Sequence, residues 1–345
     1  MAEARWNHIP ASDVAAWNGW LLRTDASLHQ FPYWNEPYRR VRCTPNYLAH
    51  GPHSAPDAYA CVLTLGLPPL RIGLVHRGPV LLGPGGASAV DRIESLLHWA
   101  RRAGVAFLRF THTDAALLEA LAATGPSERI DSFPFHRGDP KSDLVVPLPA
   151  DEHQLLASYR KDARREIRRD LRRGYEIRRE ENPEALAEVW PMFVAHSRRR
   201  GFRHLRPLSW WLDVMRHAQP DGCAYLYVAS LRGTPVAADL YVRDRNSVRS
   251  ITAWDEAALG GAPSPSTFLA WHAMHDLRQH GIRDFTLGPA AGSLLSYKRR
   301  FHPREQVFPE PVTLIANETS YRLWKAAILP LRSAWPRVRR ALRRL

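Results

Sequence analysis

Apolar and polar residues follow two different spacings along the chain, and these spacings alternate. Some segments alternate apolar and polar residues as strands do, and others repeat apolar residues about every 3.6 positions, as helices do. In the first part of the chain, strands are predicted at residues 58–67, 71–82 and 105–111, and helices at residues 88–103 and 113–124. The glycine at position 104 favours the end of the first of these helices.

The second part repeats this arrangement after a polar stretch at residues 133–142, where a domain boundary is predicted. Strands are predicted at residues 143–147, 175–179, 224–231, 235–242, 247–254 and 282–287, and helices at residues 158–174, 183–200, 207–218 and 266–280. A helix, a glycine and a strand follow each other in both parts, which indicates an internal duplication, although this order is common in α/β proteins. We therefore predict a first unit over residues 1–142, a second over 143–315 and a tail over 316–345.

One predicted helix carries a high positive charge. Between Arg160 and Arg173 there are seven Arg and one Lys against three acids, and Ala163, Ile167 and Leu171 form an apolar edge. Ion pairs three residues apart are expected for Asp162–Arg165, Glu166–Arg169 and Asp170–Arg173. This pattern favours phosphate binding, with an ordinary solvated helix face as the alternative. The candidate RNA-binding residues are Arg160, Lys161, Arg164, Arg165, Arg168, Arg169 and Arg172.

The amino-acid composition indicates which classes of partner the protein can bind. The 345 residues carry a net charge of +14, which favours polyanions such as RNA, an anionic lipid surface or a phosphorylated substrate. Three isolated cysteines indicate neither a disulfide framework nor a zinc site. The N-terminus lacks a signal-peptide pattern, and no apolar run is long enough to span a bilayer, so a cytosolic protein is expected. We also expect a monomer. The tail at 331–345 is basic and amphipathic and either packs on the protein or contacts the inner face of a membrane.

Several short segments resemble one superfamily in order and spacing. They are residues 29–34 (HQFPYW), 77–80 (RGPV), 143–146 (DLVV), 159–169 (YRKDARREIRR), 198–202 (RRRGF), 233–238 (GTPVAA), 284–288 (DFTLG) and 297–301 (YKRRF). Together they resemble the Fem family of aminoacyl transferases and its relatives with a FemAB-like acetyltransferase domain, over residues 28–312. The resemblance implies an α/β fold with two tandem GNAT-like units, each a mixed, mostly antiparallel sheet flanked by helices. The long helical hairpin of some members is absent, and Thr286 and Leu287 separate Phe285 from Gly288 where the family often reads Asp-Phe-Gly.

The resemblance also indicates site residues. It places a catalytic lysine beside an aromatic, which corresponds here to Lys298 and Tyr297, and the Lys298 ammonium suits oxyanion stabilisation. Trp34 and Phe301 are expected to contact substrate. Arg200, Arg203 and Arg206 are candidate anchors for substrate phosphates, with ordinary surface arginines as the alternative. Possible general bases are His204, Asp239, Asp255 and Asp284, and burial is expected to raise the pKa of Asp239 on its apolar strand. The family mechanism is largely substrate-assisted, which would make a dedicated base unnecessary.

No loop suits the pyrophosphate of coenzyme A well. Residues 260–267 contain two prolines that lack N–H donors, and the glycine-rich residues 83–88 lack a preceding cation. We therefore expect an aminoacyl-tRNA donor, a peptide or glycopeptide acceptor such as a cell-wall precursor or peptide natural product, no cofactor and no metal. The alternatives are an acyl-CoA-dependent N-acyltransferase of a polysaccharide or lipid pathway, and a non-catalytic module that binds RNA or membrane.

Overall fold

The computed structural model describes residues 5–52, 55–82, 88–111, 115–125, 127–128, 141–201, 206–245, 248–289 and 292–327. The chain divides into two compact units. Unit 1 comprises Met1–Val14, Tyr38–Asp139 and Pro309–Leu345, and unit 2 comprises Ala15–Pro37 and Pro140–Phe308. The units are therefore not the continuous ranges predicted from the sequence: residues 15–37 belong to unit 2 and residues 309–315 to unit 1.

Unit 1 is built on one mixed sheet in the order β1-β2-β3-β4-β6-β15-β7, with β5 paired to β3. Its strands are β1 (Trp6–His8), β2 (Cys43–His50), β3 (Ala58–Leu65), β4 (Arg71–His76), β5 (Val80–Leu81), β6 (Val105–Thr111), β7 (Ser127–Glu128) and β15 (Val312–Ile315). Strands β4 and β6 are parallel, and the other paired strands run antiparallel. Its helices are η1 (Ala11–Asp13), most of η3 (Glu36–Val41), α3 (Ala89–Arg102) and α4 (Ala115–Ala123).

Helix α3 shows how local sequence sets the elements of unit 1. Ser88 and Asp91 form a capping box at its start, and Gly104 with φ +67° follows its end. Its apolar face buries Ile93 and Leu96 completely in the core of the unit. Residues 318–327 are also helical, and Trp324 lies with its ring centroid 4.8 Å from that of Phe107 on β6. The predicted amphipathic residues 331–345 lie outside the described residues.

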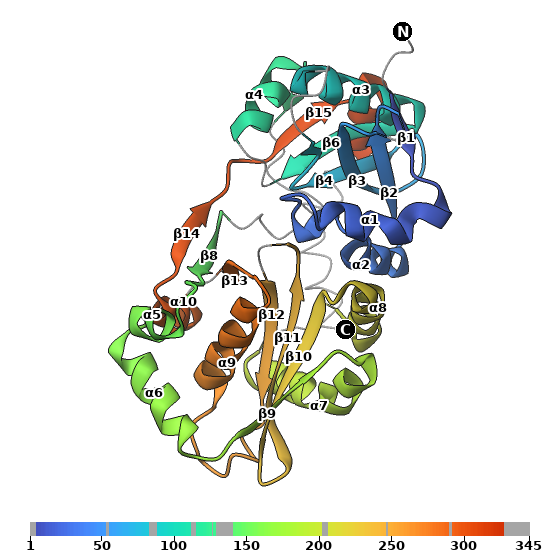
Figure 1. Cartoon of the computed structure of the whole chain (residues 1–345). Helices are drawn as coiled ribbons and strands as arrows, with labels where there is room; N and C mark the ends of the chain where they lie inside the picture. Colours follow the sequence, from blue (N-terminus) through green and yellow to red (C-terminus); the bar gives the residue numbers. More distant parts are fainter. Residues whose placement is uncertain are drawn as a thin grey trace. The chain divides into compact units, whose positions relative to one another are not determined.

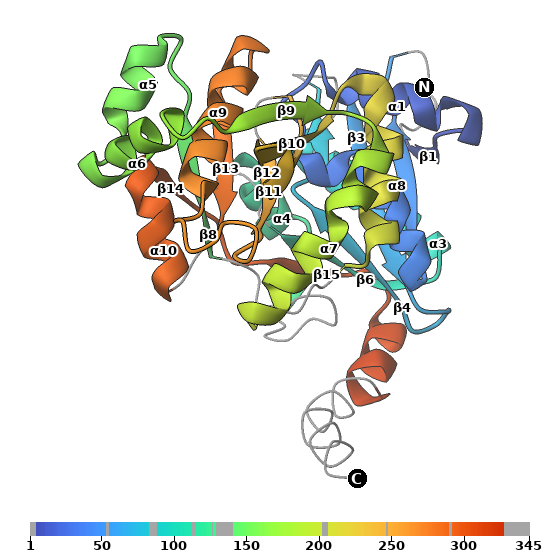
Figure 2. The ribbon, with the colours of Figure 1, turned by 90° about the horizontal axis from the view of Figure 1, so that it is seen from below.

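Unit 2 contains two antiparallel sheets, in the orders β12-β11-β10-β9 and β13-β8-β14. The strands are β8 (Ser142–Pro147), β9 (Glu176–Glu180), β10 (Ala224–Leu231), β11 (Thr234–Arg243), β12 (Val248–Trp254), β13 (Asp284–Gly288) and β14 (Arg304–Val307). The helices are most of α1 (Val14–Leu21), η2 (Leu28–Gln30), α2 (Pro32–Asn35), α5 (Glu152–Ser158), α6 (Lys161–Leu171), α7 (Pro183–Arg199), α8 (Leu208–Ala218), η4 (Gln219–Asp221), α9 (Ser266–Gln279), α10 (Gly292–Lys298) and η5 (Arg299–Phe301). Helices α5 and α6 pack beside α9 (Figures 1 and 2).

Strands β12 and β13 lie side by side, yet in the described residues no ladder of hydrogen bonds joins them. The two sheets of unit 2 therefore separate at this point. This gap positions the candidate site described below. The predicted α/β class with two units is confirmed, and a parallel strand pair is present in unit 1.

The N-terminal segment Ala15–Pro37 joins unit 2 through specific contacts. The backbone N–H of Leu28 donates to a carboxylate oxygen of Asp244 at 3.0 Å, and the Tyr33 hydroxyl donates to the carbonyl of Arg243. The Trp34 and Trp211 rings lie edge to face at 6.1 Å between centroids. These contacts bring the aromatic residues of the segment to the end of β11.

Helix α6 differs from its prediction in three details. The chain is extended at Tyr159 and Arg160, so α6 begins at Lys161 rather than at the predicted residue 158, and a separate helix, α5, precedes it. Ala163 and Ile167 are fully buried as predicted, but Leu171 is 52% exposed and Asp170 is buried in its place. Asp170 is held by Arg169 at 2.7 Å and by the predicted partner Arg173 at 3.6 Å.

The other two predicted ion pairs of α6 are wrong. Asp162 and Glu166 instead contact Arg300, at 3.0 and 2.8 Å, because this arginine approaches from η5. The long-range contacts with Arg300 thus replace the predicted ion pairs within α6. Among the described residues, no helix combines the length and apolarity needed to cross a membrane.

Candidate active site

Two pockets open in unit 2 beside the gap between β12 and β13. The smaller, about 270 Å³, is named here the tryptophan pocket and is lined by His29, Trp34, Trp211, Leu240, Val242, Ile251, Thr286, Leu287, Gly288, Pro289 and Lys298. The larger, about 430 Å³, is named the aspartate pocket and is lined by His196, Arg200, Asp239, Tyr241, Thr252, Trp254, Ser266, Ala270, Phe285, Leu287, Leu294, Tyr297 and Lys298.

The two pockets lie on opposite faces of the β11–β12 ladder. Side chains alternate between the faces of a sheet, and cross-strand partners share a face. Leu240 pairs with Ile251 and faces the tryptophan pocket, whereas Asp239 pairs with Thr252 and faces the aspartate pocket. Leu287 and Lys298 line both pockets. The pockets therefore approach each other at these two residues, where the sheets separate.

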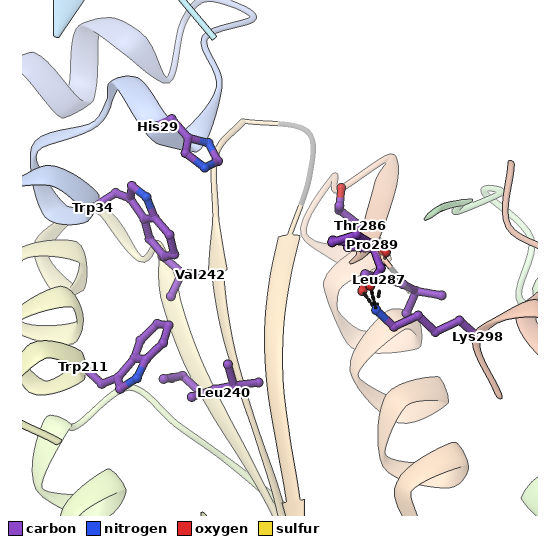
Figure 3. A pocket seen from close by; sticks show the side chains of 11 residues that line it. His29, Trp34, Trp211, Leu240, Val242, Thr286, Leu287, Pro289 and Lys298 are labelled. Carbon is purple, nitrogen blue, oxygen red and sulfur yellow. Dashed lines mark hydrogen bonds between the residues drawn. The ribbon is translucent and has the colours of Figure 1, made fainter. Parts of the chain in front are cut away.

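The Lys298 side chain closes the turn between β13 and α10. Its ammonium donates to the carbonyls of Leu287, Gly288 and Pro289, the last two at 3.4 and 2.9 Å (Figure 3). A β-bulge falls between Thr286 and Gly288 in the pairing of β13 with β8. Gly288 has φ +70°, a conformation that a residue with a Cβ adopts only with strain. Bulge and glycine together turn three successive carbonyls toward one cation.

Asp239 is the buried carboxylate of the aspartate pocket. It is 1% exposed and accepts hydrogen bonds from the Tyr241 hydroxyl at 2.5 Å and the Thr252 hydroxyl at 2.9 Å. Burial raises the pKa of Asp239 to about 7, against the opposing effect of these two hydrogen bonds. The predicted rise of this pKa is therefore confirmed. The carboxyl is poised between its charged and neutral forms near neutral pH.

The other predicted bases are placed differently. The Asp255 carboxylate accepts from the backbone N–H of Ala257 at 2.9 Å and organises a turn. Asp284 forms an ion pair with Arg304 at 2.8 Å. His204 lies outside the described residues. Neither aspartate lines the aspartate pocket or the tryptophan pocket.

The side chains of residues 297–301 point in different directions. Tyr297 and Lys298 face the aspartate pocket, and burial raises the pKa of the Tyr297 phenol to about 12. Arg299 lines an open basic hollow with Arg160, His302 and Pro303. Phe301 is fully buried, with its ring 5.2 Å from that of Tyr159. The expectation that Phe301 contacts substrate is corrected: it packs in the core against Tyr297, the neighbour of Lys298 on α10.

The structure brings together several of the predicted substrate-binding residues. Trp34 lines the tryptophan pocket with Trp211, a residue that the sequence analysis did not select (Figure 3). Arg200 lines the aspartate pocket, with its guanidinium 5.1 Å from the ring centre of Trp254. Arg206 lies over the Trp210 ring at 4.1 Å and lines neither pocket. Arg203 lies outside the described residues.

The start of α9 is occupied by an acidic side chain. Glu166 of α6 accepts a hydrogen bond from the Thr267 hydroxyl in the first turn of α9 at 2.9 Å and is held by Arg300. Pro263 and Pro265 provide no N–H donors there, and the N-cap residue, Pro265, has no side-chain cap. Helix N-termini bind phosphate through free N–H groups and positive partial charge. Here the carboxylate of Glu166, paired with Arg300, already lies beside the first turn of α9.

Helix α6 presents a row of cations on its outer surface. Lys161, Arg165, Arg168 and Arg172 are exposed, and none forms an ion pair with another described residue. Their spacing of four, three and four residues places them on one face, over about 16 Å of helix. We call this row the α6 cationic face. Arg169 is instead neutralised by Asp170, and Arg164 bonds the Ala157 carbonyl at 3.3 Å.

Within the described residues, no group of three His, Cys, Asp or Glu side chains could hold a metal ion. The glycine-rich residues 83–87 lie outside the described residues. The structure thus offers two pockets, a buried carboxylate, a lysine at their junction and a separate cationic helix face.

Comparisons with known proteins show which protein family the site region resembles. Residues 157–299 match the model of a family described as acetyltransferase (GNAT) domain. This range contains every lining residue of both pockets except His29 and Trp34. Both pockets therefore lie almost entirely within the range that matches the acetyltransferase (GNAT) domain. A search of curated protein sequences found no match.

Solved structures show the same fold across the chain. A crystal structure of FemX has a TM-score of 0.77 at 14% identity, over 92% of this chain and 99% of that one. The C-terminal domain of a putative lysylphosphatidylglycerol synthetase from Agrobacterium fabrum has a TM-score of 0.55 at 15% identity, over 91% and 95%. A tandem GNAT protein from the clavulanic acid biosynthesis pathway has a TM-score of 0.51 at 12% identity, over 91% and 99%. The chain therefore shares its fold with FemX and with this tandem GNAT protein.

Proposed function

We propose that this protein is a Fem-like acyltransferase that forms an amide bond. It takes an aminoacyl group from aminoacyl-tRNA and gives it to an amine of a peptide-bearing acceptor, such as a cell-wall precursor or a peptide natural product. The observation that carries the proposal is the approach of the two pockets at Leu287 and Lys298. Acyl transfer requires that two substrates meet with their reacting atoms about 3 Å apart, and this junction provides a place for both.

Lys298 has a defined task in this reaction. The attack of an amine on an ester carbonyl produces an oxyanion, which a nearby cation stabilises. The ammonium already holds three carbonyls, of which Gly288 is at 3.4 Å, a distance at which the hydrogen bond is weak. A substrate oxygen would replace this contact with little loss, while the contact to Pro289 at 2.9 Å keeps the ammonium in place.

Two observations favour tRNA over coenzyme A as the donor. Glu166 and two prolines leave the start of α9 unsuited to a pyrophosphate. The α6 cationic face and the adjoining hollow at Arg160 and Arg299 suit the repeated phosphates of a nucleic acid. The peptide acceptor would be held by its contacts in the aspartate pocket, including Arg200.

The test uses the different chemistry of esters and amides. The protein is incubated with tRNA charged with radiolabelled amino acids and with a cell-wall pentapeptide that has a free side-chain amine. Mild alkali releases label from the ester of aminoacyl-tRNA but not from an amide product. We expect alkali-stable label on the peptide. Labelled acetyl-CoA is tested in parallel, and transfer from acetyl-CoA alone would contradict the donor proposed here.

A further inference from the structure

A carboxylate without a counter-ion forms part of the wall of the aspartate pocket. Asp239 is 1% exposed, and among the described residues no Lys, Arg or His forms an ion pair with it. Its hydrogen-bond partners are the hydroxyls of Tyr241 and Thr252. Burial of a charge without an opposite charge is unfavourable for folding. A buried aspartate without an opposite charge, in a pocket wall, indicates a chemical task.

We infer that Asp239 is the general base that removes the proton of the acceptor amine, with Thr252 as the hydroxyl that relays it. The inference rests on the proposed function in one respect, the amine acceptor. It does not depend on whether the donor is aminoacyl-tRNA or acyl-CoA.

The two hydrogen bonds of Asp239 give its oxygens different roles. Tyr241 is fully buried, so its hydroxyl only holds Oδ2 in place. Thr252 is partly exposed, lies directly opposite Asp239 in the β11–β12 register and lines the same pocket. Its hydroxyl donates to Oδ1 and keeps its lone pairs for a group in the pocket. A proton can thus pass from the pocket to Thr252 while the Thr252 proton passes to Asp239.

The step balances without any further reactant. The acceptor amine binds in its neutral form, after the extra proton of the ammonium has gone to solvent. Its nitrogen forms a bond to the acyl carbon, and the acyl carbonyl becomes an oxyanion beside Lys298. One proton leaves the nitrogen and reaches the Asp239 carboxylate through Thr252. The bond from the acyl carbon to its leaving oxygen or sulfur then breaks, and Asp239 returns the proton to that leaving group. The enzyme ends in its starting protonation state.

The electrostatic environment supports this role. Burial raises the pKa of Asp239 to about 7, close to the range in which a general base is most effective. Other titratable or charged groups face Asp239 or its pocket from α7 and its C-cap, β10, β11 and α10. They are His196, Arg200, Tyr227, Tyr241, Tyr297 and Lys298.

The experiment compares pH profiles of kcat/KM from about pH 5 to 9. Labelled aminoacyl-tRNA and labelled acetyl-CoA are both tested as donors to the amine-bearing pentapeptide. The wild-type rate should rise with pH to a plateau near neutrality. Asp239→Asn should lose about 100-fold or more together with this rise. Thr252→Val should show a similar loss, and Thr252→Ser should restore most of the rate because it keeps the hydroxyl.

A second variant tests the role of Tyr241 through a shift rather than a loss. Tyr241→Phe removes a hydrogen bond to the charged carboxylate, so the rise should move to higher pH by about one unit. Two control variants test whether the pH dependence comes from Asp239. Asp255→Asn should keep the wild-type pH profile. His196→Gln should keep the rise of kcat/KM with pH, which shows that this rise does not come from the histidine in the pocket.

Infrared difference spectra of wild type against Asp239→Asn give a readout that needs no substrate. The stretch of a protonated carboxyl should disappear as the pH rises through neutrality. The inference is overturned if Asp239→Asn keeps the wild-type rate and profile with the active donor, or if the carboxyl ionises below about pH 5. Transfer from acetyl-CoA alone, with the rise still dependent on Asp239, would contradict the donor assignment and leave the base in place. Failure of both donors would overturn both proposals.

Discussion

Asp239→Asn should change how the stability of the folded chain depends on pH. Burial raises the pKa of Asp239 from 3.8 to about 7. Below pH 3.8 the carboxyl is protonated in both the folded and the unfolded chain, so it causes no pH dependence. Between the two values the folded chain keeps a proton that the unfolded chain has lost. The free energy of unfolding therefore falls as pH rises, and the fall ends above about pH 7.

The expected size follows from the two pKa values. A difference of one pKa unit corresponds to about 1.4 kcal/mol, so a carboxyl shifted from 3.8 to about 7 accounts for about 4 kcal/mol. Asp239 is buried, so solvent screening does not reduce this figure. The asparagine keeps one acceptor oxygen and weakens one hydrogen bond, at about 1 kcal/mol at every pH. The variant should thus be about 1 kcal/mol less stable than wild type at low pH and about 3 kcal/mol more stable at high pH.

Urea unfolding measures this difference directly. Tryptophan fluorescence follows the transition, since the chain has 12 tryptophans, and both proteins are unfolded at several values from about pH 4 to 8.5. Asp255→Asn is the matched control for loss of a carboxyl close to the end of β12. A stability difference that stays constant with pH would contradict a raised pKa of Asp239. A variant that becomes less stable than wild type as pH rises would show that the folded protein favours the charged carboxylate.

Three further predictions concern other parts of the site. Lys298→Ala should lower kcat/KM for acyl transfer by about 100- to 1000-fold through loss of oxyanion stabilisation, and a rate within tenfold of wild type would argue against this role. Gly288→Ala should lower the free energy of unfolding by about 1–2 kcal/mol because φ is +70° there; an unchanged urea midpoint would contradict the strain. Replacing Arg165 and Arg168 by Gln should reduce the slope of log Kd for tRNA against log salt concentration by about 0.7–0.9 per residue. Arg169→Gln is the control: the charge of Arg169 is already paired with Asp170, so this variant should change the slope less.

The local order of elements could be predicted well from the sequence. The predicted strands at residues 105–111 and 224–231 coincide with β6 (Val105–Thr111) and β10 (Ala224–Leu231). Runs of apolar residues bounded by glycines carry this information locally. The place of residues 15–37 could not be predicted in the same way. It depends on hydrogen bonds from Leu28 and Tyr33 to residues more than 200 positions away.

The candidate site was only partly predictable for the same reason. Lys298, Tyr297 and Arg200 could be predicted because they lie in segments whose sequence resembles the family. The structure shows that all three line one pocket. Phe301 belongs to the same pattern but is buried, because a motif does not state which side chain faces the core. Glu166 was expected to pair with a neighbour on its own helix. It instead contacts Arg300 and, at the start of α9, Thr267.

The most direct test of the account locates the aminoacyl end of the donor on the protein. A tRNA charged with a photoreactive amino acid, p-benzoylphenylalanine, is bound to the wild type, irradiated and digested, and the cross-linked peptides are identified by mass spectrometry. The account predicts cross-links to residues that line the junction of the two pockets, such as Leu287 and Tyr297, and their loss in competition with unmodified aminoacyl-tRNA. Cross-links confined to unit 1, or labelling that aminoacyl-tRNA does not reduce, would contradict it.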